Sequence, residues 1–262
     1  MKRATIDLTL KLSANMLRAK SADGKPVILK LTDEHEVEVL RRLHRNQSMK
    51  QTRIIPLLDV VDGRLIVLPQ RTPLPLFLDL DASIGDIGEL ALQFLEGVAT
   101  LQGSSVAHLD LKPDNIVVQR DPKSKKVDLS IIDVNIAVFA DAEPTISTSN
   151  GTDGWSAPEV LAGKPYDPLL ADRWSCGRVL KHFTKLMEPS PLRERLCKLS
   201  QKLMVPSPSR RPPIPDRLSL CSQVGGTPSA MRRGSGQKKK RKSARRKGTE
   251  PQDRASPLVA VT

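Results

Sequence analysis

The hydrophobic pattern of the chain changes close to residue 72, and this change limits the folds that the chain can adopt. Before this point, short alternating runs predict a hairpin around "ADGK" (residues 22–25) and two further strands around Asp62-Gly63. A single helix is expected between these strand pairs, over residues 33–45, because apolar residues recur there at helical spacing. The first part of the chain is therefore rich in strands.

After this point the pattern is dominated by helices. A proline-rich connector, "RTPLPL" (residues 71–76), separates the two parts and marks the predicted lobe boundary. No strand is expected beyond residue 133. The predicted helices cover residues 86–104, 172–187 and 192–204, and two short strands cover residues 115–119 and 127–133.

This order of elements predicts an α+β fold with two lobes. The N-lobe (residues 1–72) is small and β-rich with one helix, and the C-lobe (residues 73–221) is larger and mainly helical. Apolar residues make up 39% of the chain, which is enough for a globular interior, and a cleft between two lobes is where a ligand is expected.

The last segment, residues 222–262, has a different composition. It is rich in Gly, Ser and Pro, and from Gly225 to Thr262 it holds 11 Lys and Arg against 2 Asp and Glu. Such a segment is expected to be disordered, because it cannot bury enough apolar area to offset the entropy of ordering. Its run "KKKRKSARRK" (238–247) favours binding to an importin and a nuclear location, although weak non-specific nucleic-acid binding and a cytoplasmic location stay open.

Cysteine usage and hydropathy exclude several classes of protein. Cys176, Cys197 and Cys221 form no C-x-x-C pair, so reduced thiols are favoured over disulfides or a metal site. No apolar run approaches 18 residues, and the N-terminal residues lack the apolar segment of a signal peptide. An intracellular protein without a membrane span is expected.

The stretch "HLDLKPDNIVV" (108–118) carries groups suited to phosphoryl transfer from ATP. Asp110 can accept the proton of an attacking hydroxyl, and Lys112 can neutralise the transferring phosphate. Asn115 can bind Mg²⁺ through its amide oxygen, because hard cations prefer oxygen ligands. A second metal ligand is expected at Asp133, which ends an apolar strand, and Lys30 with Glu36 fits a lysine that holds phosphates and a helical carboxylate that fixes it.

Four motifs in order resemble the eukaryotic protein-kinase family, and they span about residues 16–213. "HLDLKPDN" is similar to the catalytic loop of that family, and "GTDGWSAPE" (151–159) is similar to the end of its activation segment. "DRWSCGRVL" (172–180) and "PSRRP" (208–212) resemble the helix and the arginine motif that follow. The "LKP" after Asp110 and the threonine at position 152 resemble the Ser/Thr branch of the family rather than the Tyr branch.

The resemblance implies a role for each matched residue. The catalytic residues would be Asp110 as base, Lys112 as phosphate contact and Asn115. The Mg²⁺ ligands would be Asn115 and Asp133. The residues that bind ATP would be Lys30, paired with Glu36, together with Leu68 at the back of the adenine pocket, Gln70 in the hinge of residues 69–71, and Asp133. Structural roles would fall to Asp172, which braces the catalytic loop, to Thr152 near Asp110, and to a Glu159–Arg211 pair.

The sequence departs from the family pattern at four places. "LKLSANML" stands where the glycine-rich loop belongs, and "DVN" replaces D-F-G, so Asn135 is the expected site of any positive φ there. Leu109 replaces the arginine that in the family binds a phosphorylated activation segment. The helices after Phe183 are shortened.

Three functions follow, in decreasing order of support. The first is an ATP- and Mg²⁺-dependent kinase that phosphorylates Ser or Thr of a protein substrate, since base, metal ligands and both lysines are present. The second is a pseudokinase scaffold that binds ATP weakly or not at all, because the glycine-rich loop is missing. The third is a nucleic-acid-binding protein that acts through its basic tail.

Overall fold

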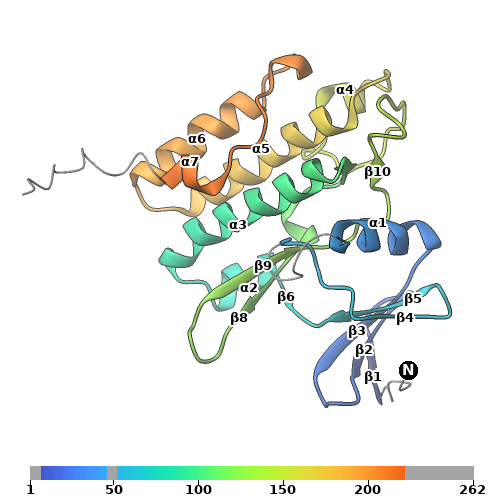
Figure 1. The fold of residues 1–262 in the computed structure, drawn as a ribbon. Helices are drawn as coiled ribbons and strands as arrows, with labels where there is room; N and C mark the ends of the chain where they lie inside the picture. Colours follow the sequence, from blue (N-terminus) through green and yellow to red (C-terminus); the bar gives the residue numbers. More distant parts are fainter. Residues whose placement is uncertain (1–6, 46–51, 222–262) are drawn as a thin grey trace, which may run out of the picture. The chain divides into compact units, whose positions relative to one another are not determined.

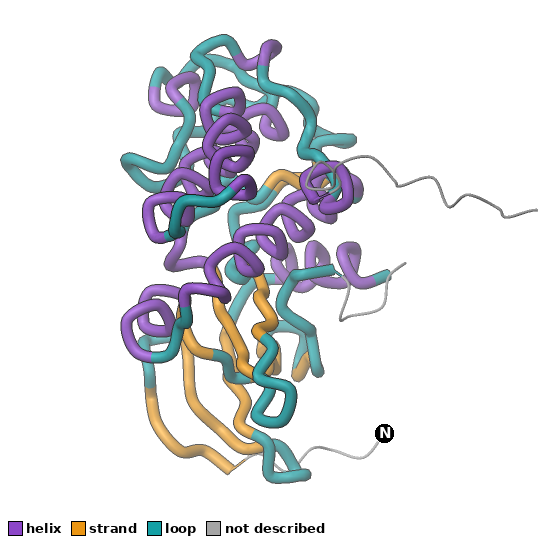
Figure 2. Tube along the Cα trace, turned by 90° about the vertical axis from the view of Figure 1, so that its left-hand side faces the viewer, coloured by secondary structure: helices purple, strands orange, loops and turns teal. Residues whose placement is uncertain are grey.

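The computed structural model describes residues 7–45 and 52–221. The basic segment 222–262, with its predicted disorder, lies outside the described residues. The strands gather in one region and most of the helices in another (Figures 1 and 2). The predicted α+β fold with a β-rich N-lobe and a helical C-lobe is confirmed.

The N-lobe is a five-stranded antiparallel sheet in the order β1-β2-β3-β5-β4. Its strands are β1 (Asp7–Lys11), β2 (Met16–Lys20), β3 (Pro26–Leu31), β4 (Asp59–Val61) and β5 (Leu65–Pro69). The register of β2 against β3 places Leu17 and Ala19 on a face with Val27 and Leu29, where they form a small apolar cluster. The opposite face of the sheet therefore points toward the C-lobe side of the molecule, and it carries Lys30.

Helix α1 (Glu34–His44) is the single helix of the N-lobe. Asp33 caps it by accepting a hydrogen bond from the backbone N–H of Glu36 at 3.0 Å. Acidic residues in its first turn and basic residues in its last turn suit the helix dipole. Its buried side chains, which include Val37, Leu40 and Leu43, anchor it to the core.

The C-lobe is built around two long helices, α3 (Ile84–Gly103) and α5 (Pro168–Leu186), whose Phe94 and Phe183 rings lie 6.2 Å apart. The shorter helices are α2 (Leu74–Leu80), α4 (Pro158–Leu161), α6 (Pro191–Leu203) and α7 (Arg217–Cys221), with 3₁₀ turns at Pro113–Asn115 and Pro208–Arg210. Two small sheets, β6-β8-β9 and β10-β7, comprise β6 (Thr72–Pro73), β7 (Val106–Ala107), β8 (Ile116–Arg120), β9 (Val127–Ile131) and β10 (Val138–Phe139).

Two places hold secondary structure that was not predicted. Within the connector 71–76, Thr72 and Pro73 pair with β8, and helix α2 begins at Leu74. Prolines suit this place, since the first turn of a helix needs no N–H donor. Strand β10 lies beyond residue 133 and was missed, because two residues carry too short a pattern to read. In the described part of the chain, no helix is both long and apolar enough to cross a bilayer.

Candidate active site

A buried ion pair joins the sheet to helix α1. Lys30 of β3 donates its Nζ to Glu36 Oε1 at 2.8 Å, and the two residues are only 8% and 2% exposed. Thr32 donates to the other oxygen of Glu36. Burial alone would lower the pKa of Lys30, but Glu36 and Asp133 outweigh it, so the net pKa is raised and the amine stays charged.

Asp133 lies just beyond β9 and adds a carboxylate from the C-lobe to the Lys30–Glu36 pair. Its Oδ1 accepts a hydrogen bond from Lys30 Nζ at 2.6 Å. Asp133 itself adopts a left-handed backbone with φ of 65°, whereas Asn135 does not have a positive φ. The positive φ therefore falls two residues before Asn135, the position expected for it from the sequence. Aspartate tolerates this conformation better than most residues with a side chain.

A second polar group surrounds Asp110 in the loop of residues 108–115. Asp110 Oδ1 accepts from Thr152 Oγ1 at 2.7 Å, and Oδ2 accepts from Asn115 Nδ2 at 2.9 Å. Lys112 Nζ lies 2.7 Å from Asp110 Oδ2 and also donates to Thr152 Oγ1 at 2.7 Å. The carboxylate is thus fixed by donors from three different residues.

The backbone of this loop is held from below by Asp172 of α5. Its two carboxylate oxygens accept from the backbone N–H of His108 at 2.6 Å and of Leu109 at 2.9 Å. Leu109 has a φ of 64°, which is strained for a leucine, so these bonds hold an otherwise unfavourable turn. Complete burial raises the pKa of Asp172 to about 6, against the opposing effect of His108 and the two amides.

Leu109 is packed into an apolar cluster with residues of the activation segment. It is 5% exposed and shares this cluster with Ile146, Ala157 and Tyr166, among others. Ile146 and Tyr166 exchange backbone hydrogen bonds of 3.0 and 2.9 Å, and the Tyr166 hydroxyl donates to the Thr148 carbonyl at 2.9 Å. Apolar packing and these bonds hold the segment where the family uses an arginine.

The expected pair between Glu159 and Arg211 is present. Arg211 donates Nη1 to Glu159 Oε1 at 2.5 Å and Nη2 to Oε2 at 2.8 Å. Arg211 is 2% exposed, and it also donates to the backbone carbonyls of Leu170 and Val205. This arginine ties the end of the activation segment to α5 and to the chain that follows α6.

Most of the predicted site residues line one cavity of about 450 Å³ between the N-lobe sheet and the C-lobe. Asp110 and Lys112 do not line it, but they adjoin it through the hydrogen bonds to Asn115. The predicted residues on its wall are Lys30, Glu36, Leu68, Gln70, Asn115 and Asp133. Ile28, Val117 and Ile132 add an apolar part, so the cavity has one polar and one apolar end.

The donor set of this cavity fits Mg²⁺. Asn115 points its Nδ2 at Asp110, which turns its Oδ1 the other way, and Asp133 uses only Oδ1 for Lys30. Within the described residues, neither Asn115 Oδ1 nor Asp133 Oδ2 has a hydrogen-bond partner. Two free, hard oxygens on one wall suit a cation that shares its remaining ligands with phosphates. No cluster of three His, Cys, Asp or Glu side chains suited to a metal occurs in residues 7–45 and 52–221.

Arg71 of the hinge is anchored by contacts that were not predicted from the sequence. Arg71 donates to Asp128 Oδ2 and to Ser130 Oγ, both at 2.9 Å, and Asp128 also accepts from Arg53 at 2.7 Å. Side chains alternate along β9, so the sequence could predict that Asp128 and Ser130 lie on the same face of the strand. It gives no signal that Arg71 donates hydrogen bonds to them.

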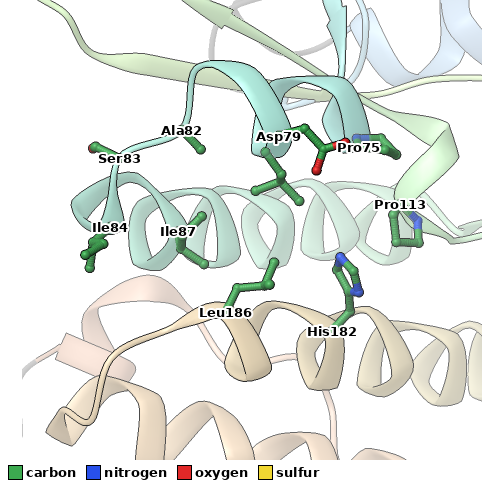
Figure 3. A pocket seen from close by; sticks show the side chains of 10 residues that line it. Pro75, Asp79, Ala82, Ser83, Ile84, Ile87, Pro113, His182 and Leu186 are labelled. Atoms are coloured by element: carbon green, nitrogen blue, oxygen red, sulfur yellow. The ribbon is translucent and has the colours of Figure 1, made fainter.

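A second cavity, of about 380 Å³, lies between α2, the start of α3 and α5. Figure 3 shows His182 and Leu186 of α5 facing Ile87 of α3 across it, with Pro113 at one end. Its lining is mainly apolar, and Asp79 and His182 are its ionisable side chains. None of the predicted site residues lines it, so the chemistry belongs to the first cavity.

Comparisons with known proteins agree with this geometry. A family model for the Protein kinase domain matches residues 22–216. The chain is 41% identical over 91 residues to the serine/threonine-protein kinase ppk24, mitochondrial, of Schizosaccharomyces pombe, which covers 34% of this chain and 20% of the relative. It is 30% identical over 175 residues to the CBL-interacting serine/threonine-protein kinase 3 of Arabidopsis thaliana, covering 61% and 39%. The chain thus spans less than half the length of these relatives.

Proposed function

The chain belongs to the protein kinase family, and we propose that it transfers the γ-phosphate of ATP to Ser or Thr of a protein substrate. The observation that carries this proposal is the Asp110 carboxylate. It is held by Thr152, Asn115 and Lys112 next to a cavity that contains a Lys30–Glu36 pair and two free metal-binding oxygens.

In this reaction Asp110 accepts the proton of the substrate hydroxyl while the hydroxyl oxygen bonds to the γ-phosphorus. The bond between that phosphorus and the β–γ bridging oxygen breaks, and ADP leaves with the bonding electrons. Lys112 places its charge beside Asp110, where the phosphoryl group passes, and Lys30 faces the phosphates that stay behind. Asn115 and Asp133 would hold Mg²⁺, which would supply positive charge to the phosphates.

A pseudokinase that only holds nucleotide is the second candidate, and one observation favours it. The turn between β1 and β2 is closed on itself, since the amides of Leu12 and Ser13 both donate to the Met16 carbonyl, at 2.9 and 3.2 Å. These amides are not free to bind phosphates as those of a glycine-rich loop are.

Phosphate transfer from radiolabelled Mg-ATP to a generic basic protein distinguishes the two candidates. The wild type is compared with Asp110→Ala purified alongside, and the shift in melting temperature with ATP is measured for both. A kinase transfers phosphate, and the variant loses at least about 100-fold in rate while keeping its thermal shift. A thermal shift without transfer by the wild type identifies a pseudokinase.

The basic run 238–247 lies outside the described residues, so a role in nuclear import is supported only by its charge. We propose that it binds an importin and directs the chain to the nucleus, with weak non-specific nucleic-acid binding as the alternative. Deleting residues 225–262 should change the cellular distribution and leave ATP binding intact. An unchanged distribution contradicts the import role, and loss of RNA affinity in the deletion supports the alternative.

A further inference from the structure

We propose that Arg18 of β2 binds the phosphates of the nucleotide and takes over the task of the missing glycine-rich loop. This inference rests on the proposed function, and it names a residue that the family resemblance does not assign. Three observations carry it: the face on which Arg18 lies, the charges that surround the cavity, and the hydrogen bonds of the β1–β2 turn.

Strand register places Arg18 on the wall of the cavity. Arg18 pairs with Ile28 of β3, and Ile28 pairs with Leu68 of β5, so the three side chains form one row on the same face. All three line the cavity. The neighbours Leu17 and Ala19 point to the opposite face and join an apolar cluster there. The charged side chain of Arg18 therefore faces the proposed site of the nucleotide.

The position along the strand brings Arg18 within reach of the phosphate end. Met16, two residues earlier, pairs with Lys30, the residue proposed to meet the phosphates. Two residues of a strand span only about 7 Å, and strand side chains lean along the strand direction. A long, flexible arginine that starts over Ile28 can thus place its guanidinium beside Lys30.

The charge balance of the cavity singles out Arg18. Lys30 is bound by Glu36 and Asp133, and Arg71 is bound by Asp128. Of the cations that line the cavity, Arg18 alone has no hydrogen bond or ion pair within the described residues, and it is exposed. A nucleoside triphosphate carries several negative charges, and a planar guanidinium binds phosphate oxygens in a bidentate manner.

Among the described side chains of the β1–β2 hairpin, Arg18 is the cation that lines the cavity, and the backbone of the turn does not take its place. The amides of Leu12 and Ser13 are consumed by the Met16 carbonyl, and Ser13 Oγ donates to the Asn15 side chain at 2.9 Å. The Asn15 carbonyl in turn accepts from the Leu31 amide at 2.8 Å. A side-chain cation replaces the backbone amides that a glycine-rich loop would present.

Binding of Mg-ATP and of adenosine, measured by titration calorimetry on the full chain, tests this inference. The variants are Arg18→Met, Arg18→Lys and the matched control Lys20→Met. Lys20 lies on the same strand and face as Arg18, but outside the cavity lining, so its loss removes the same charge without the contact.

We expect Arg18→Met to weaken Mg-ATP binding about tenfold or more and to leave adenosine binding unchanged. Arg18→Lys should retain part of the affinity for Mg-ATP, and Lys20→Met should stay within about twofold of the wild type. Unchanged Mg-ATP affinity in Arg18→Met overturns the inference. An equal loss for Mg-ATP and adenosine also overturns it, because Arg18 would then contact the base. A wild type that binds no ATP at all refutes the proposed function as well.

Discussion

The floor and the roof of the cavity are built in different ways. The floor is the loop of residues 108–115, which lines the cavity with Asp114 and Asn115 and holds Asp110 next to it. In this loop Asp110 receives hydrogen bonds from Thr152 and Asn115, and the buried Asp172 binds the backbone. The roof is the β1–β2 hairpin (residues 7–20), in which the amides of the turn donate to a backbone carbonyl of the same turn. Its exposed Arg18 has no hydrogen bond or ion pair within the described residues.

The contrast indicates which parts of the site need a fixed geometry. A general base must lie within hydrogen-bond distance of the proton it takes, so the floor is held by buried groups that cannot move independently. A phosphate can be bound by a flexible cation from several positions. Asp110, Lys112 and Asn115 of the family pattern are therefore kept in the floor, where only Leu109 departs from it, whereas the glycines of the roof are absent.

The largest loss of stability is expected from breaking the buried ion pair between Glu159 and Arg211. Glu159→Ala leaves Arg211, which is 2% exposed, without its carboxylate partner. Loss of one member of a buried ion pair costs about 3–5 kcal/mol, so urea denaturation should show a large fall in the free energy of unfolding. Glu188→Ala, at an exposed glutamate, is the control. A loss below about 1 kcal/mol for Glu159→Ala contradicts a supporting role.

A smaller, pH-dependent effect is expected at Asp172. Burial raises its pKa from 3.8 to about 6 in the folded chain, so between these values the folded state binds the proton that the unfolded state has released. The contribution of Asp172 to stability is therefore highest below pH 4 and falls by up to about 3 kcal/mol as pH rises through 6.

Unfolding free energies of wild type and Asp172→Asn, measured from pH 4 to 7, check this sign. The difference between the two proteins should shift in favour of the variant as pH rises, because asparagine does not titrate. Asp153→Asn, at an exposed carboxylate, should leave the pH profile as it is. A wild type that gains stability relative to Asp172→Asn over this range contradicts the prediction.

A modest effect is expected in the activation segment. Tyr166→Phe removes the hydrogen bond from the hydroxyl to the Thr148 carbonyl and keeps the apolar packing with Leu109. The expected loss is about 1 kcal/mol of unfolding free energy, as for an ordinary buried hydrogen bond. A larger loss, measured by urea denaturation, would mean that this bond rather than the apolar cluster holds the segment.

The sequence predicted the floor better than the roof. Asp110, Lys112 and Asn115 lie within one short loop, so their spacing alone brings them together, and Glu36 follows a readable helix cap at Asp33. The Lys30–Asp133 contact joins residues far apart in the chain, and it was not predicted: Lys30 was paired with Glu36, and Asp133 was expected as a metal ligand.

Other features depend on tertiary packing that local patterns do not encode. The positive φ falls on Asp133 rather than Asn135, because the ion pair with Lys30 sets where the chain turns. Strand β10 is two residues long and pairs only with β7, so its sequence carries no alternation to detect. The free charge of Arg18 becomes visible only once the partners of Lys30 and Arg71 are known.

The smallest effect is expected from restoring a glycine to the roof. Ser13→Gly removes the hydrogen bond to Asn15, but the amides of residues 12 and 13 remain bound to the Met16 carbonyl. The affinity for Mg-ATP should therefore change by less than about threefold, a shift of under 1 kcal/mol. Ser21→Gly, in the β2–β3 turn outside the cavity, controls for added backbone freedom. A tenfold gain in Mg-ATP affinity for Ser13→Gly alone would show that one side chain keeps the turn closed. The difference between floor and roof would then depend on a single residue and not on the backbone hydrogen bonds of the whole hairpin.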